Sequence, residues 1–212
     1  TDSETLRIQR SNLDGTELED VITTGLADPK GIAVDSAAGK IYWADLELFR
    51  LKRADLDGSN VETVVFPAAS SAWGIALDVA SGKMYWPNAL DYAVRRSNLD
   101  GSGVEDLVAL SPYYPTGMAL DHAAGKMYFG GYPGRVYRAN LDGSSLELLV
   151  DLGVGDLRAI AVDPGAGHMY WTNSYFDQGV GAFNGRVWRA DLDGSNQVAV
   201  ISTAVHGVDF LG

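Results

Sequence analysis

The sequence contains no cysteine among its 212 residues. Disulfide bonds, thiolate metal sites and cysteine nucleophiles are therefore excluded. Basic residues are scarce too, because 16 Lys and Arg stand against 28 Asp and Glu and give a formal net charge of −12. Nucleic acids and anionic membranes are bound through clustered Lys and Arg, so this composition argues against both as partners.

Long hydrophobic runs and helical periodicity are also missing. No apolar stretch approaches the roughly 18 residues that a membrane-spanning helix needs, so no membrane insertion is expected. The chain has a repeat instead. An aromatic pair returns about every 43 residues, at Tyr42-Trp43, Tyr85-Trp86, Tyr128-Phe129 and Tyr170-Trp171. A fixed period of this length indicates a repeat architecture.

Two further motifs keep the same period. "GIAVD" at 31–35 returns as "GIALD", "GMALD" and "AIAVD", and a Leu-Asp-Gly turn follows each aromatic pair. Each unit divides into four short segments with alternating or β-branched residues and glycine turns between them. This pattern predicts four antiparallel strands, called A to D here. Four-stranded units that repeat about every 40–45 residues are typical of β-propeller blades.

The aromatic motif, preceded by "GIAVD" and Gly-Lys and followed by Arg-x-Asn-Leu-Asp-Gly, resembles the YWTD, or class B, repeats of low-density lipoprotein receptors. The resemblance covers nearly the whole chain. We expect the aromatic pairs to fill the gaps between blades, because such rings bury roughly 150–250 Å² each. The resemblance also implies that the arginines before each Leu-Asp-Gly turn pair with acidic residues within or between blades: Arg10, Arg53, Arg96, Arg138 and Arg189.

The number of blades stays open at this point. YWTD propellers usually have six blades, whereas this chain begins with strands C and D and ends with a strand A. We expect one domain over 1–212, most simply a five-bladed ring. Its full repeats are placed at approximately 31–66, 74–109, 117–150 and 159–201, and its closing blade combines 205–211 with 5–22. The alternative is part of a six-bladed propeller.

One face of the predicted ring varies from blade to blade. The A–B and C–D turns on the opposite face are nearly identical in every unit, whereas the B–C and D–A loops differ and carry aromatic and acidic residues. Variable loops on a rigid scaffold commonly bind ligands. The candidate ligand-binding residues are Phe49, Trp73, Asp91, Tyr92, Tyr113, Tyr132, Arg158, Tyr175, Phe176, Asp177 and Phe183. The long B–C loop at 172–185 is expected to lean over the channel toward Trp73.

Catalytic and metal-binding patterns were sought and not found. His122, His168 and His206 are separated by the repeat, so a histidine metal site or a Ser-His-Asp triad is not expected. The aspartates of the Leu-Asp-Gly turns lie in different blades, whereas calcium needs six to eight oxygens, so each is expected to shape its own turn. The residues at the channel mouth, Lys30, Trp73, Thr116, Arg158 and Ala204, are poor metal ligands.

We therefore expect a non-enzymatic binding module without a cofactor or metal. The resemblance implies a protein or peptide ligand and an extracellular or secreted location. A carbohydrate-binding lectin is the alternative, and a metal-dependent lactonase or lyase is a less favoured one. Because the residues that could touch a ligand differ in every unit, we expect one asymmetric site. Its aromatics and carboxylates favour a partner with Arg or Lys beside an apolar anchor.

Overall fold

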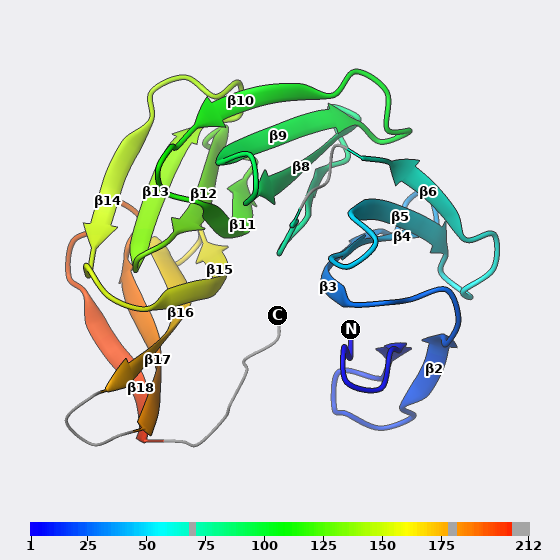
Figure 1. The fold of residues 1–212 in the computed structure, drawn as a ribbon, viewed down its shortest axis with the longest axis horizontal. Helices are drawn as coiled ribbons and strands as arrows, with labels where there is room; N and C mark the ends of the chain where they lie inside the picture. Colours follow the sequence, from blue (N-terminus) through cyan, green and yellow to red (C-terminus); the bar gives the residue numbers. More distant parts are fainter. Residues whose placement is uncertain (68–70, 178–181, 205–212) are drawn as a thin grey trace.

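The structure, a computed structural model, describes residues 1–67, 71–177 and 182–204. Those ranges contain strands and no helix, and hence no helix that could cross a membrane. Four four-stranded antiparallel sheets and one two-stranded sheet follow each other around an arc, with their inner strands toward its centre (Figure 1). The predicted all-β propeller architecture is therefore confirmed.

Each complete sheet is one blade of consecutive strands. Sheet 1 holds β3 (Pro29–Asp35), β4 (Lys40–Asp45), β5 (Arg50–Asp55) and β6 (Glu62–Val65). Sheet 2 holds β7 (Ala76–Asp78), β8 (Lys83–Asn88), β9 (Ala93–Asn98) and β10 (Glu105–Ala109). Sheet 3 holds β11 (Pro115–Asp121), β12 (Lys126–Gly131), β13 (Arg135–Asn140) and β14 (Glu147–Asp151). Sheet 4 holds β15 (Asp156–Asp163), β16 (His168–Asp177), β17 (Ala182–Asp191) and β18 (Val198–Ala204).

The N-terminal sheet consists of β1 (Ile8–Arg10) and β2 (Glu19–Ile22), which occupy the places of strands C and D. The strand predicted at 205–211 lies outside the described residues. The composite closing blade and the five-bladed ring therefore stay predictions. In the described part of the chain, no sheet combines strands from both ends.

The aromatic pairs lie in the gaps between blades, as predicted. Tyr42 packs with Ile75 and Trp86 of the following blade, whereas Trp43 packs with Ile8 and Ile22 of the preceding sheet. This division follows from the strand geometry, because successive side chains point to opposite faces. Trp43, Trp86 and Phe129 are completely buried, and Trp171 is 1% exposed. Apart from Tyr170, which is half-buried and belongs to none of the core clusters, the aromatic stripe is core and is not available to a ligand.

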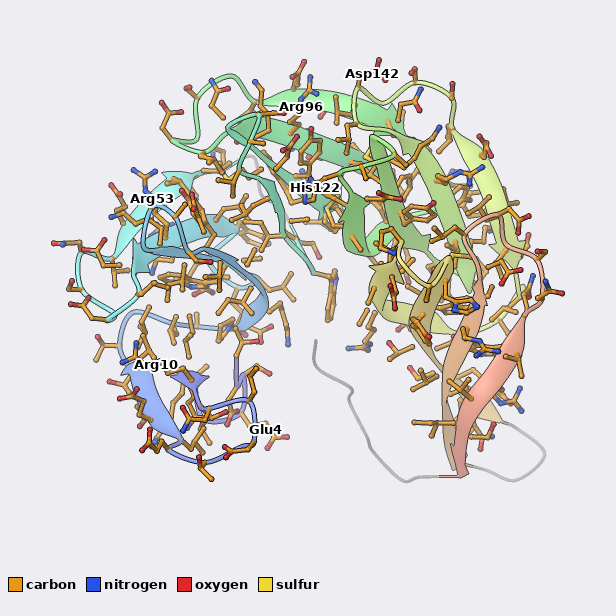
Figure 2. The ribbon with its side chains drawn as sticks, turned by 180° about the vertical axis from the view of Figure 1, so that it is seen from behind. Glu4, Arg10, Arg53, Arg96, His122 and Asp142 are labelled. Atoms are coloured by element: carbon orange, nitrogen blue, oxygen red, sulfur yellow. The ribbon has the colours of Figure 1, made fainter. Side chains whose placement is uncertain are left out.

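The arginines before the Leu-Asp-Gly turns are structural. Arg53 forms an ion pair with Glu62 at 2.6 Å in its own blade and donates a hydrogen bond at 3.1 Å to the carbonyl of Leu99 in the next. Arg10 and Arg96 repeat both contacts on neighbouring blades (Figure 2). The turn aspartates are structural too, since Asp57 accepts bonds from the amide and hydroxyl of Ser59.

The residue two positions after the aromatic pair differs between blades, and its local contacts explain why: Asp45, Asn88, Gly131 and Asn173. Asp45 is buried and accepts hydrogen bonds of 3.1 Å from the amides of Ala27 and Asp28, which holds the D–A loop against strand β4. Asn173 replaces this contact by donating to the carbonyl of Val154 at 3.2 Å. A side chain at Gly131 would lie 2.7 Å from the ring of Tyr137. Gly131 is therefore required because Tyr137 occupies the space.

Candidate functional site

A pocket of about 190 Å³ opens at the centre of the arc, where the first strands of the complete blades converge. Its wall is formed by backbone at Gly31, Gly74 and Gly117 and by apolar side chains of the same strands. The glycines permit this convergence, because a side chain at Gly31 would lie 2.5 Å from the α-carbon of Gly74. The pocket wall is therefore tightly packed, and it consists of glycine backbone and apolar side chains.

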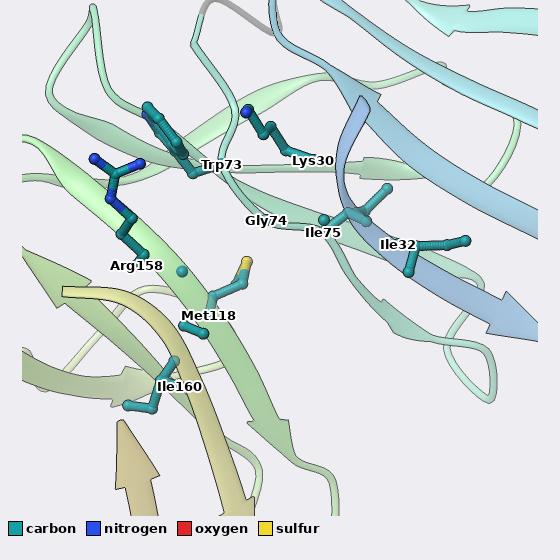
Figure 3. Close-up of a pocket in the computed structure, with 11 residues that line it drawn as sticks. Lys30, Ile32, Trp73, Gly74, Ile75, Met118, Arg158 and Ile160 are labelled. Atoms are coloured by element: carbon teal, nitrogen blue, oxygen red, sulfur yellow. The ribbon is translucent and has the colours of Figure 1, made fainter. Parts of the chain in front are cut away.

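Three side chains stand at the pocket's mouth (Figure 3): Lys30, Trp73 and Arg158. The Lys30 ammonium lies 5.4 Å from the centroid of the Trp73 ring, and the Arg158 guanidinium carbon lies 4.9 Å from it. Cations within about 6 Å of an indole face are attracted by its quadrupole. The indole thus holds two cations at the mouth of a channel in a protein that is acidic as a whole.

Each of these cations has an acidic neighbour. Asp28 lies 2.8 Å from the Lys30 ammonium, and Asp156 lies 3.5 Å from the Arg158 guanidinium. A guanidinium can bind carboxylates in bidentate fashion, and the Arg158 side chain is 35% exposed. The mouth therefore carries two cations and two carboxylates around one indole. The predicted preference for a partner with Arg or Lys stays a prediction.

Sheet 3 forms an aromatic rim beside the mouth. The Arg135 guanidinium carbon lies 3.9 Å from the centroid of the Tyr113 ring, and its Nε lies 3.1 Å from an oxygen of Asp151. The rings of Tyr114 and Tyr132 stack at 4.8 Å between centroids with an interplanar angle of 6°. Tyr132 is 42% exposed. The rim is therefore held rigid by stacking while one of its rings stays open to solvent.

The half-buried side chain of Tyr114 provides a test of this arrangement. Burial, with a smaller contribution from Asp156, raises the pKa of Tyr114 to about 12. An ordinary tyrosine has a pKa of about 10, so the native state retains this proton more strongly than the unfolded chain. Stability is therefore expected to fall as the pH rises from about 10 to about 12. Urea unfolding at pH 9 and above pH 11 should show a smaller loss for Tyr114→Phe than for the wild type, whereas equal losses would contradict it.

The other predicted loop residues are spread around the same face. Phe49 and Tyr92 are 43% and 40% exposed and both have positive φ angles, of 51° and 54°. Asp91 forms an ion pair with Arg95 at 2.9 Å and accepts a hydrogen bond from Asn88. Among the predicted residues, Trp73 and Arg158 lie together at the channel mouth. The Asp91 side chain instead stabilises its own loop.

The expectation for the long B–C loop was wrong in its local structure. Most of 172–185 extends strands β16 and β17 into a hairpin, in which Phe176 pairs with Phe183 and Asp177 with Ala182. The side chains of Asp177 and Phe183 lie outside the described residues. Tyr175 lines a different cavity, of about 280 Å³, with Leu152, Val154, Asn173, Arg186 and Trp188. Tyr175 and Trp73 therefore belong to separate pockets.

Sequence reasoning overlooked three cations as ligand-binding candidates. Lys30 stands over Trp73, Arg135 over Tyr113, and Arg186 lies 5.5 Å from the centroid of Tyr175. A signal was present, because Lys30 occupies the same repeat position as Trp73 and Arg158, and Arg186 occupies the same repeat position as Arg135, the first residue of β13. Among the residues that the structure describes, no group of three or more His, Asp or Glu is arranged to hold a metal ion.

Comparison with known proteins identifies the repeat. Residues 39–79 match the model of the low-density lipoprotein receptor repeat class B. The chain is therefore a β-propeller that contains a class B, or YWTD, repeat. The low-density lipoprotein receptor-related protein 5 of mouse is 49% identical over 41 residues, and the human protein is 46% identical over 41 residues. Each match covers 19% of this chain and 2% of the receptor, so this chain corresponds to a small part of those proteins.

Solved structures share the propeller architecture. A structure of a nidogen–laminin complex contains a chain that superposes with a TM-score of 0.76 at 23% identity, over 95% of the YWTD-repeat chain and 72% of that chain. A TolB-like protein from Agrobacterium tumefaciens gives a TM-score of 0.76 at 13% identity, over 94% and 75%. The GH74 enzyme of Niastella koreensis gives 0.66 at 14% identity, over 91% and 34%. At these identities the likeness establishes the fold alone.

Proposed function

We propose that this YWTD-repeat propeller is a non-catalytic module that binds a protein or peptide ligand at the channel mouth of its variable face. The observation that carries the proposal is the placement of Trp73 between Lys30 and Arg158 above an apolar pocket. Aromatic and arginine side chains grouped around a concave surface are typical of binding hot spots. The ligand segment carries a carboxylate for the two cations and a neighbouring apolar side chain for the pocket.

The neighbouring rim extends this site in one direction. Tyr132 and the Arg135–Tyr113 pair lie at the third complete blade, and the described residues of the other blades do not repeat this combination. A ligand that enters the mouth can extend across these rings without meeting an equivalent site elsewhere. The site is therefore asymmetric, which favours one ligand per chain. The similarity to a low-density lipoprotein receptor-related protein and to a chain of a nidogen–laminin complex supports a protein ligand and an extracellular location.

A paired screen tests the ligand class. The protein is immobilised and exposed in parallel to a display library of random peptides and to a glycan array. Selection of acidic peptides that contain an apolar residue next to Asp or Glu supports the proposal. Selection of glycans alone would overturn it in favour of a lectin.

The stoichiometry of binding is a separate expectation. Titration calorimetry with a selected peptide should give about one peptide per chain, because the mouth is formed jointly by several blades. A repeat lectin would instead show a similar pocket in each blade and a value near the number of complete blades. Such a value would contradict an asymmetric site even if the peptide affinity were high.

A further inference from the structure

The long hairpin of sheet 4 forms one wall of the cavity of about 280 Å³. Strands β16 and β17 have ten residues each, whereas β4, β5, β8, β9, β12 and β13 have six each. Four side chains on one face of this hairpin line the cavity: Asn173, Tyr175, Arg186 and Trp188. The opposite wall is the loop between β14 and β15. The cavity therefore lies between two complete neighbouring blades (Figure 1).

The loop that forms the opposite wall is fixed by contacts at both of its ends. The amide of Leu152 donates to the carbonyl of Gly134 at 3.0 Å. Asn173, which is 3% exposed, donates to the carbonyl of Val154 at 3.2 Å. An added side-chain carbon at Gly155 would lie 2.1 Å from Oδ1 of Asn173, so the loop packs directly on the hairpin. The cavity is therefore preformed, and the 53% exposed Val154 lies on its outer side.

Arg186 is the charged group of this cavity. Its guanidinium carbon lies 5.5 Å from the centroid of the Tyr175 ring and 5.8 Å from that of the Trp188 ring. Both distances are within the range in which a ring attracts a cation. A guanidinium carries its N–H donors at the edge of a planar group, so it can contact ring faces and bind a carboxylate at the same time.

The cross-strand neighbours of Arg186 leave its charge without a carboxylate. Both are neutral: Asn173 and Ser202. The arginines at the same repeat position in sheets 1 and 3 each stand opposite a carboxylate: Arg50 opposite Asp45, and Arg135 opposite Asp151. In the part of the chain that the structure describes, Arg186 has no ion pair and no side-chain hydrogen bond. A ligand carboxylate is the group that this position lacks.

We propose that this cavity binds a small monocarboxylate with a compact apolar tail, as a second ligand site apart from the channel mouth. The carboxylate pairs with the Arg186 guanidinium, and the tail packs between the Trp188 ring and the aliphatic wall of Leu152 and Val154. Sites for drug-sized ligands have about 300–1,000 Å³, so this cavity fits a smaller molecule. A ligand of roughly ten heavy atoms is expected to bind in about the millimolar range.

A ligand-observed NMR titration with hydrocinnamate tests the requirement for charge. Hydrocinnamate should bind the wild-type protein. Hydrocinnamide has the same tail and no charge, so it should bind roughly tenfold more weakly or less well still. Equal affinities of the two compounds would overturn the proposal, and so would the absence of hydrocinnamate binding at about 10 mM.

Two variants test the location of the site. Arg186→Gln removes the cation and should weaken hydrocinnamate binding by roughly 10-fold to 100-fold, because a hydrogen bond to a charged group is lost. Val154→Trp keeps the cation and fills the cavity, and it should weaken binding to a similar extent. Arg189→Gln is the matched control, since it makes the same change of charge on the opposite face of β17. It should bind hydrocinnamate like the wild type.

Arg158→Gln reports on the channel mouth in the same titration. If it weakens hydrocinnamate binding while Arg186→Gln and Val154→Trp bind like the wild type, the carboxylate binds at the mouth and the second site is overturned. Equal weakening in all three arginine variants would indicate general attraction of an anion and would overturn it as well. Near-ultraviolet circular dichroism confirms that each variant is folded. The proposal is supported when Arg186→Gln and Val154→Trp weaken binding and Arg189→Gln does not.

Discussion

Replacing Gly101 with Ala is expected to destabilise the protein by roughly 2–5 kcal/mol. This loss adds the strain of a side chain in a left-handed backbone conformation to steric overlap in the packed interface, or seam, between two blades. Gly101 has a φ of 84°, and an added side-chain carbon would lie 1.8 Å from the carbonyl oxygen of Val64. Backbone cannot move aside as a flexible side chain can. The two blades must separate, and the buried contact between them is weakened along its length.

The chain contains its own control for this experiment. Gly15 occupies the same place in the sequence Asn-Leu-Asp-Gly, has a φ of 80°, and has no described atom within 4 Å of an added side-chain carbon. Gly15→Ala therefore keeps the backbone strain and omits the overlap, with an expected cost of about 1–2 kcal/mol. Urea unfolding at low protein concentration measures both. Equal losses in the free energy of unfolding would mean that the interface at Gly101 can relax, or that Gly15 is also in a packed contact in solution.

The fold could be predicted from the sequence because its determinants are local and repeated. The period defines the unit, the alternation defines the strands, and the Leu-Asp-Gly turns define the hairpins. The burial of the aromatic pairs followed from the same reasoning, since a propeller leaves a gap beside each of them. Extension of β16 and β17 was missed because Gly179, Gly181 and Gly185 indicate a loop, whereas the strand pairing continues through Asp177 and Ala182.

The candidate site was harder to predict because its members meet only in three dimensions. Lys30, Trp73 and Arg158 are far apart in the sequence and share only a position in the repeat. Their residue types differ from blade to blade, so no sequence motif identifies them. The charge at the mouth also depends on which carboxylates lie near Lys30 and Arg158, and composition alone does not place Asp28 and Asp156 there. Repeat positions at the start of strand A are the signal that can locate such residues in related chains.

Replacing Trp73 with Ala is expected to weaken peptide binding by roughly 30-fold to 1000-fold, which corresponds to the loss of about 2–4 kcal/mol at a binding hot spot. The indole supplies apolar contact at the pocket and holds the Lys30 and Arg158 side chains at its ring. Its removal therefore loses contact area and lets both cations move into solvent. The probe is a peptide with one acidic and one apolar residue, selected on the wild-type protein from a display library.

Leu146→Ala is the matched control for this measurement. Leu146 is 43% exposed and follows a Leu-Asp-Gly turn on the face opposite the variable loops. The Leu146→Ala variant should therefore bind the peptide as the wild type does. Arg158→Glu should weaken binding of an acidic peptide more than binding of its amidated counterpart, because only the former presents a carboxylate to the mouth. Near-ultraviolet circular dichroism confirms that each variant is folded. If Trp73→Ala binds with wild-type affinity, the ligand occupies another part of the variable face and the channel mouth is not its anchor.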